Sequence, residues 1–133
     1  SEHRPCSSDV QVLVVDTMGE LPLFYGTSDV AFVGGSLMPH GGHNLLEPAA
    51  LGRAVITGPH YFNFNEITKQ FLKAGAAIEV SDTSSLAKTV IDLLQNSQQR
   101  AEMGEAGLKL IVNSQGASMR LSNLIKRNIF HGR

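Results

Sequence analysis

The sequence has little cysteine, little net charge and no long apolar run, and each shortage excludes a class of protein. Its 133 residues include one cysteine, Cys6, so neither an internal disulfide framework nor a multi-cysteine metal site can form. The 12 acidic residues nearly balance 11 basic ones, without the basic excess of a general nucleic-acid binder. No apolar run approaches the roughly 18 residues of a transmembrane helix, so we expect a soluble chain.

What is present suits one globular domain. The residues are 42% hydrophobic and 17% charged, a composition that can bury a core and is untypical of disordered chains. Residues 1–9 are polar and predict a linker, so we expect the domain to occupy residues 10–133. All acidic residues precede Lys109, and only basic charges follow it. This basic end is a solvated face, a surface for an anionic partner such as lipid headgroups, or a contact with another domain.

Hydrophobic periodicity alternates between strand and helix. Short β-branched or apolar runs predict four strands, at residues 10–15, 29–33, 54–57 and 76–80. Four strands alternating with helices predict an α/β fold, a Rossmann-like doubly wound parallel sheet with right-handed crossovers. Helical spacing predicts helices at residues 19–28, 44–51, 64–74, 98–113 and 115–129, and a further one capped by Asp82, Ser84 or Ser85.

Ligands of such sheets bind at the carboxyl ends of the strands, which draws attention to the loop after residue 15. A helix that begins at Met18, Gly19 and Glu20 would direct free N–H groups and its positive dipole end toward a phosphate. Thr17 and Glu20 have the spacing of a capping box, so helix capping is an alternative interpretation of this segment. Helix capping and phosphate binding are compatible, because a capped helix keeps further free amides that can bind a phosphate.

The loop after residue 33 is rich in glycine. Two pairs, Gly34-Gly35 and Gly41-Gly42, bracket a segment that opens directly into a predicted helix. Paired glycines cost chain entropy, so a functional or steric reason is expected. Their spacing matches neither the dinucleotide-binding nor the P-loop motif.

Polar residues of this loop have several possible roles. Asn44 and Glu47 either cap the helix or, in the case of Glu47, accept the hydroxyls of a ribose. His43 is expected to be a neutral hydrogen-bond partner, because no cysteine or second carboxylate completes a metal site with it and His40. Ser36 lacks the G-x-S-x-G elbow of serine hydrolases.

Together these motifs resemble one family. DTMGEL (residues 16–21), FVGGS (32–36), GGHNLLEPAALGRAVITGP (41–59), FNF (62–64) and NSQGA (113–117) are similar to the C-terminal half of the 3-deoxy-D-manno-octulosonic acid (Kdo) transferases of lipopolysaccharide synthesis. The resemblance runs from about Val12 to Arg127.

The resemblance implies a GT-B glycosyltransferase, in which two Rossmann-like domains face a cleft and this chain is the nucleotide-sugar-binding one. It implies CMP-Kdo as the donor, no cofactor and no metal. The implied CMP-binding residues are Met18, Gly19 and Glu20 at the phosphate and nucleotide, and Asn44, Leu45, Leu46 and Glu47 at the ribose. The implied supporting loop contains Gly34, Gly35, Ser36, Gly41, Gly42 and His43.

The resemblance also implies what a further domain supplies. The family's general base, a glutamate, and its membrane-associating segment lie in an N-terminal domain outside this sequence, so we expect the chain alone to be inactive. The acceptor would be the lipid A precursor, and the parent protein would work at the cytoplasmic face of the bacterial inner membrane. Two alternatives stay open: the donor domain of a UDP-sugar enzyme, and a stand-alone nucleotide-binding module. A severed domain should expose a large apolar patch, whereas a stand-alone module should not.

Overall fold

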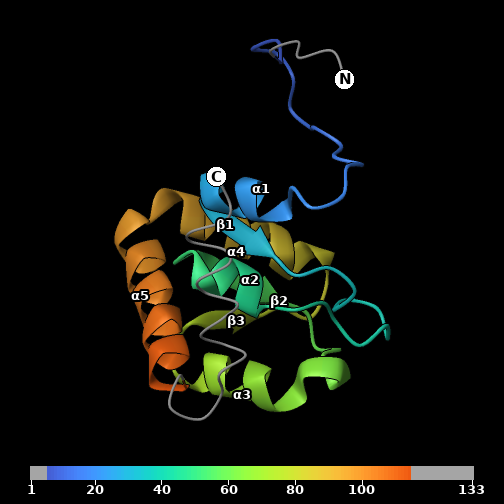
Figure 1. The fold of residues 1–133 in the computed structure, drawn as a ribbon. Coiled ribbons are helices and arrows are strands. Elements are labelled where there is room, and N and C mark those ends of the chain that lie inside the picture. The colour runs from blue at the N-terminus through green and yellow to red at the C-terminus, as the bar shows by residue number, and fades with distance from the viewer. Residues whose placement is uncertain (1–5, 115–133) are drawn as a thin grey trace.

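The computed structural model describes residues 6–114, and a parallel sheet of three strands lies at its centre (Figure 1). The strands β1 (Val30–Phe32), β2 (Ala54–Thr57) and β3 (Ala77–Glu79) are hydrogen-bonded in that order. The helices are α1 (Leu21–Thr27), α2 (Leu46–Ala50), the 3-10 helix η1 (Phe62–Phe64), α3 (Asn65–Lys73), α4 (Thr83–Gln95) and α5 (Ser97–Asn113).

Alternate side chains of the central strand enter two different cores. Val55 packs with Phe71 of α3 and Ile111 of α5 on one face of the sheet. Ile56, the next residue, packs with Leu93 of α4 on the other face. Both faces of the sheet are therefore covered by helices, because side chains alternate along a strand. The predicted α/β class is confirmed.

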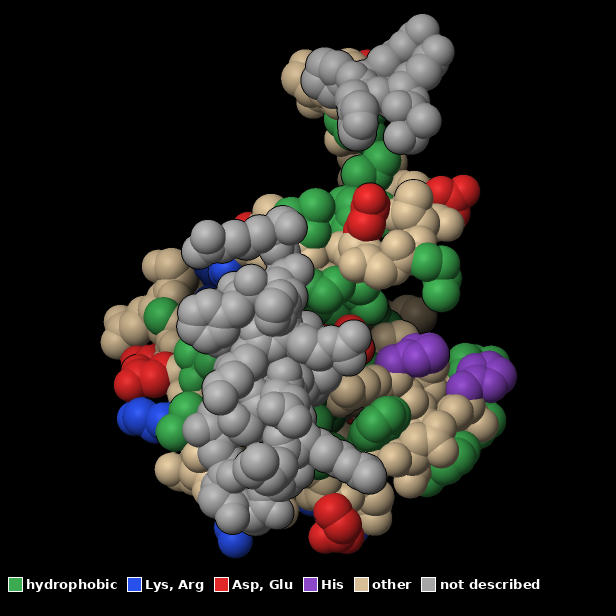
Figure 2. Space-filling model, in the orientation of Figure 1, with side chains coloured by type: hydrophobic (Ala, Val, Ile, Leu, Met, Phe, Trp, Pro, Cys, Tyr) green, Lys and Arg blue, Asp and Glu red, His purple; other side chains and the backbone are tan. Residues whose placement is uncertain are grey.

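The prediction of a first strand at residues 10–15 is wrong. Each of these side chains is exposed, and the exposed fractions of Val12 and Val14 reach 80% and 82%. A strand requires a neighbour that accepts and donates its backbone hydrogen bonds, and none of the described residues fills this place beside residues 10–15. Residues 6–19, here termed the N-terminal arm, instead extend away from the body of the molecule (Figures 1 and 2).

Helix boundaries follow the predictions with local differences. Helix α1 begins at Leu21 rather than at residue 19, and no side chain caps it. Thr17 and Glu20 do not form the capping box, since the Thr17 hydroxyl donates to the Glu20 carboxylate (2.7 Å) instead. The predicted cap of α4 is confirmed at Asp82.

The described part of the chain ends before some predicted features. The helix predicted at residues 115–129, most of the basic end and part of the NSQGA motif lie outside the described residues. Within residues 6–114, no helix has the length and apolar character needed to cross a membrane.

Candidate functional site

Ser36 joins the loops that follow β1 and β2. Its buried hydroxyl donates to the carbonyl of Val33 (2.5 Å) and accepts from the amide of Gly58 (2.8 Å). Its carbonyl accepts from the amide of His60 (2.9 Å). The buried hydroxyl thus both donates and accepts within the protein, so Ser36 has a structural role and holds the two loops together at the carboxyl edge of the sheet.

The two glycine pairs lie side by side. The amide of Gly42 donates to the carbonyl of Gly35 (3.0 Å), and the amide of His43 donates to that of Gly34 (3.1 Å). A Cβ at Gly35 would lie 3.3 Å from the imidazole Cδ2 of His43, and Gly35 has a φ of +71°. For Gly35 the expected steric reason is thus the close approach of the His43 ring, together with a backbone conformation that favours glycine.

A cavity of about 420 Å³ opens between α1, this glycine loop and the start of α2. Seven residues line this cavity, of which four were predicted from the sequence as site residues and three were not. The nominated residues are Gly34, His43, Asn44 and Glu47, and the others are Leu21, Tyr25 and Phe64. Phe64 belongs to the FNF motif of the resemblance, whereas Tyr25 was missed, because an aromatic residue at helical spacing resembles a core residue.

The polar side chains of the cavity are placed by the first turn of α2. Glu47 belongs to that turn and is half-buried. The side-chain oxygen of Asn44 accepts from the amide of Leu46 (3.0 Å), which fixes the carboxamide at the beginning of the helix. The Leu45 side chain is buried, so a contact of Leu45 with a ligand would use its backbone, and the partly buried side chain of Leu46 packs against the core.

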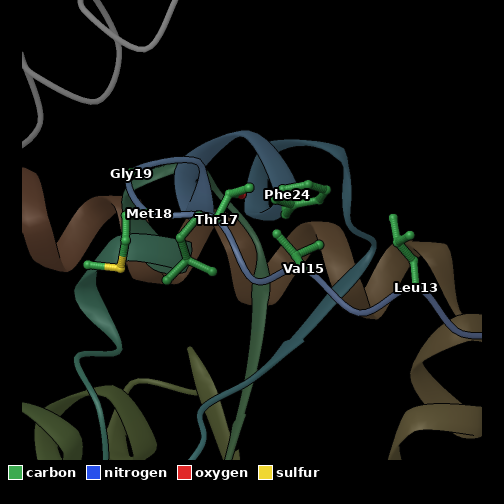
Figure 3. A pocket seen from close by; sticks show the side chains of 7 residues that line it. Leu13, Val15, Thr17, Met18, Gly19 and Phe24 are labelled. Atoms are coloured by element: carbon green, nitrogen blue, oxygen red, sulfur yellow. The ribbon is translucent and has the colours of Figure 1, made fainter. Parts of the chain in front are cut away.

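The structure separates Met18 and Gly19 from this cavity. They line an adjoining cavity of about 550 Å³ between the N-terminal arm and α1, together with Leu13, Val15, Thr17, Leu21 and Phe24 (Figure 3). Leu21 lines both cavities, whereas Glu20 lines neither and is hydrogen-bonded to Thr17. In Figure 3, Met18 points away from Phe24, and its exposed fraction is 96%. The predicted binding residues therefore fall into two adjacent groups.

The cavity at Glu47 carries a negative charge. Burial, and then the negative charge of Glu47, raises the pKa of Tyr25 above its ordinary value of 10.0. None of the described residues that line the cavity is Lys or Arg. Within residues 6–114, no three His, Cys, Asp or Glu side chains are grouped so that they could hold a metal ion. The described lining therefore suits a neutral, hydroxyl-bearing group better than an anion.

Known proteins resemble the chain in sequence. Residues 1–110 match the family model described as "Glycosyl transferases group 1". A 3-deoxy-D-manno-octulosonic acid transferase of Haemophilus influenzae is 45% identical over 121 residues, which make up 90% of this chain and 28% of the relative. The protein of the same name from Bordetella pertussis is 40% identical over 111 residues, or 84% of this chain and 26% of the relative. The chain thus spans about a quarter of the length of these relatives.

A solved structure resembles the chain in fold. The C-terminal CMP-Kdo binding domain of WaaA from Acinetobacter baumannii has a TM-score of 0.70 and 37% sequence identity. The match covers 73% of this chain and 51% of that chain. The resemblance to Kdo transferases and the assignment of the fold to a GT-B C-terminal domain are therefore confirmed.

Proposed function

The chain belongs to the group 1 glycosyl transferases, and from this premise we propose that it binds CMP-Kdo as the donor domain of a Kdo transferase. The support comes from the likeness to a CMP-Kdo binding domain and from the position of the Glu47 cavity. That cavity adjoins the loop after β1, which is where ligands of parallel sheets bind. The position of Glu47 in its lining is the observation that carries the proposal, because a carboxylate can accept hydrogen bonds from ribose hydroxyls.

The predicted residues Met18, Gly19 and Glu20 extend the proposed site toward the phosphate of CMP. Gly19 has a φ of +82°, and nothing lies within 4 Å of the position that a Cβ would take, so a ligand can approach its backbone closely. Leu21 lines the cavities on both sides, and a nucleotide could therefore run from Glu47 past α1 to Met18, Gly19 and Glu20. Leu45 would contribute its backbone amide, whereas the amide of Leu46 already donates to Asn44 and would hold that side chain in place.

The reaction we propose for the intact protein is an inverting displacement. A carboxylate base on another domain would take the proton of an acceptor hydroxyl on the lipid A precursor, and the oxygen would attack the anomeric carbon of Kdo. The bond from that carbon to the phosphate oxygen breaks, and CMP leaves with the electron pair. The chain supplies the leaving-group side of this arrangement and should transfer no sugar alone. The intact protein would act at the cytoplasmic face of the inner membrane.

The N-terminal arm supports a donor domain over a stand-alone nucleotide-binding module. Val12, Val14 and Met18 are among the most exposed of its apolar side chains. Apolar surface of this kind is untypical of a complete soluble module and is common where another part of a protein packs. The arm therefore favours a domain that works with further structure.

The proposal is tested by titrating the chain with CMP and with UDP in a calorimeter. We expect CMP to bind and UDP to bind more weakly. Glu47→Ala should weaken CMP binding by about tenfold or more, because a charged hydrogen-bond acceptor is lost. Glu79→Ala is the matched control, since Glu79 is a carboxylate at the end of β3 that does not line the cavity.

Three results would contradict the proposal. Tighter binding of UDP would favour a UDP-sugar enzyme, and an unchanged affinity for CMP in Glu47→Ala would remove Glu47 from the site. Detectable transfer of Kdo by the isolated chain would show that a second domain is not needed for the chemistry.

A further inference from the structure

Tyr25 lines the same cavity as Glu47 but was not among the site residues predicted from the sequence. It lies on α1, one turn after Leu21, and both residues line the cavity with Glu47 of α2. Helices α1 and α2 are in contact, so the phenol and the carboxylate are held on neighbouring walls. The Tyr25 side chain is half-buried, and no described residue is hydrogen-bonded to its hydroxyl.

The cavity offers hydrogen-bond donors as well as an acceptor. Because the Asn44 oxygen accepts from Leu46, the two N–H groups of the same carboxamide remain for a ligand. The Tyr25 hydroxyl is protonated at neutral pH, since burial and the charge of Glu47 both raise its pKa. The Glu47 carboxylate accepts only. A ligand group that both donates and accepts, such as a sugar hydroxyl, matches this combination.

We propose that Tyr25 is a specificity-determining residue that reads the ribose of the donor nucleotide together with Glu47. One ribose hydroxyl would donate a hydrogen bond to the Glu47 carboxylate. The Tyr25 hydroxyl would donate a hydrogen bond to an oxygen of the same ribose diol. This inference rests on the proposed function, because it assigns Tyr25 to the nucleotide of that site. It predicts strong selection for ribose over deoxyribose, since a missing hydroxyl leaves Tyr25 and Glu47 without partners in a half-buried site.

The test compares CMP with 2′-deoxy-CMP and 3′-deoxy-CMP as ligands of the wild type and of Tyr25→Phe. We expect the wild type to bind CMP at least about tenfold more tightly than one of the deoxy analogues. In Tyr25→Phe that preference should fall by about three- to tenfold, with weaker binding of CMP and little change for the deoxy analogue. A purely structural role of the hydroxyl would weaken all three ligands alike and leave the preference unchanged.

The second tyrosine of the chain provides the control. The pKa of Tyr61 is also raised, by burial and by Glu79, but Tyr61 does not line the cavity. Tyr61→Phe should therefore leave both the affinity for CMP and the preference for ribose unchanged. If the wild type binds CMP and Tyr25→Phe keeps the full preference, the role of Tyr25 is refuted while the proposed function stands. If the wild type does not bind CMP, both are refuted.

Discussion

Gly58 marks the point at which the end of β2 meets the loop after β1. A methyl group on its Cα would overlap the backbone carbonyl of Ser36 and lie 2.6 Å from the amide nitrogen of Leu37. Both neighbours are backbone atoms, which cannot rotate away as a side chain can. The glycine is therefore required by close packing of two loops, without any need for a positive φ.

We predict that Gly58→Ala lowers the free energy of unfolding by about 1–3 kcal/mol, the usual cost of overpacking. Gly26→Ala is the control, because nothing lies within 4 Å of its Cβ position and Gly26 is inside α1. This control should be neutral or should stabilise the protein by up to about 1 kcal/mol. Urea denaturation of both variants measures the difference, and equal stabilities would show that the Ser36 contact is adjustable.

Residues of the site could be predicted from the sequence where they follow directly on the carboxyl end of a strand. Glu47 follows a glycine loop after a strand, and this position predicted a ribose contact beside the alternative of a helix cap, whereas Asn44 was assigned to the ribose by the family resemblance. Met18 was assigned to the site by the family resemblance, in a loop expected to follow a strand at residues 10–15, and the structure places it in a neighbouring cavity. Tyr25 could not be nominated from spacing, because a helical aromatic residue has the same pattern whether it faces a core or a ligand.

At the scale of elements, the start of α4 is the most completely specified feature. The Asp82 carboxylate accepts from the amide of Ser85 (2.7 Å), and the Ser85 hydroxyl accepts from the amide of Asp82 (3.1 Å). This reciprocal capping box is local in sequence, so the residues alone could predict it. Its hydrogen bonds lower the pKa of Asp82 below the ordinary value of 3.8.

A lowered pKa in the folded protein makes the cap sensitive to acid. The stabilisation is fully present above pH 3.8, the unfolded value, and is lost as the pH falls through the lower folded value. We predict that Asp82→Asn is less stable than the wild type at neutral pH and that the difference disappears in acid. Thermal unfolding from about pH 7 to about pH 2 measures it, and a constant difference over this range would contradict the prediction.

The strand predicted at residues 10–15 shows what local sequence cannot supply. Its β-branched residues have high strand propensity, but this propensity expresses fit to a paired, half-buried surface. The three strands that do form are held in register by neighbours distant in the sequence, such as Ile56 between Phe32 and Ile78. Periodicity identifies a segment that can form a β-strand. Whether the strand forms depends on whether another strand lies beside it to share backbone hydrogen bonds.

For the whole molecule, the N-terminal arm is the largest departure from a closed globular surface. Leu13 and Val15 face the cavity beside α1, whereas Val12 and Val14 are more exposed. Exposed β-branched segments with unpaired backbone groups associate with one another. The isolated chain should therefore self-associate as its concentration rises.

We predict that the double variant Val12→Lys and Val14→Lys reduces this self-association in sedimentation experiments. Its free energy of unfolding should stay within about 0.5 kcal/mol of the wild type, as for other exposed positions. The matched variant Leu13→Lys and Val15→Lys places the same charges next to the apolar cavity and should also destabilise the arm against α1. A wild type that stays monomeric at all concentrations would contradict the prediction.

The bonds made by Ser36 have a consequence for the energetics of recognition. They join the loops after β1 and β2 to each other, and the amide of Asn63 adds a further bond to the carbonyl of Gly41 (3.1 Å). The conformational entropy of these glycine-rich loops is thus lost when the protein folds rather than when a ligand arrives. A ligand that entered the cavity beside these loops would meet a preorganised site, so more of its contact energy would appear as affinity.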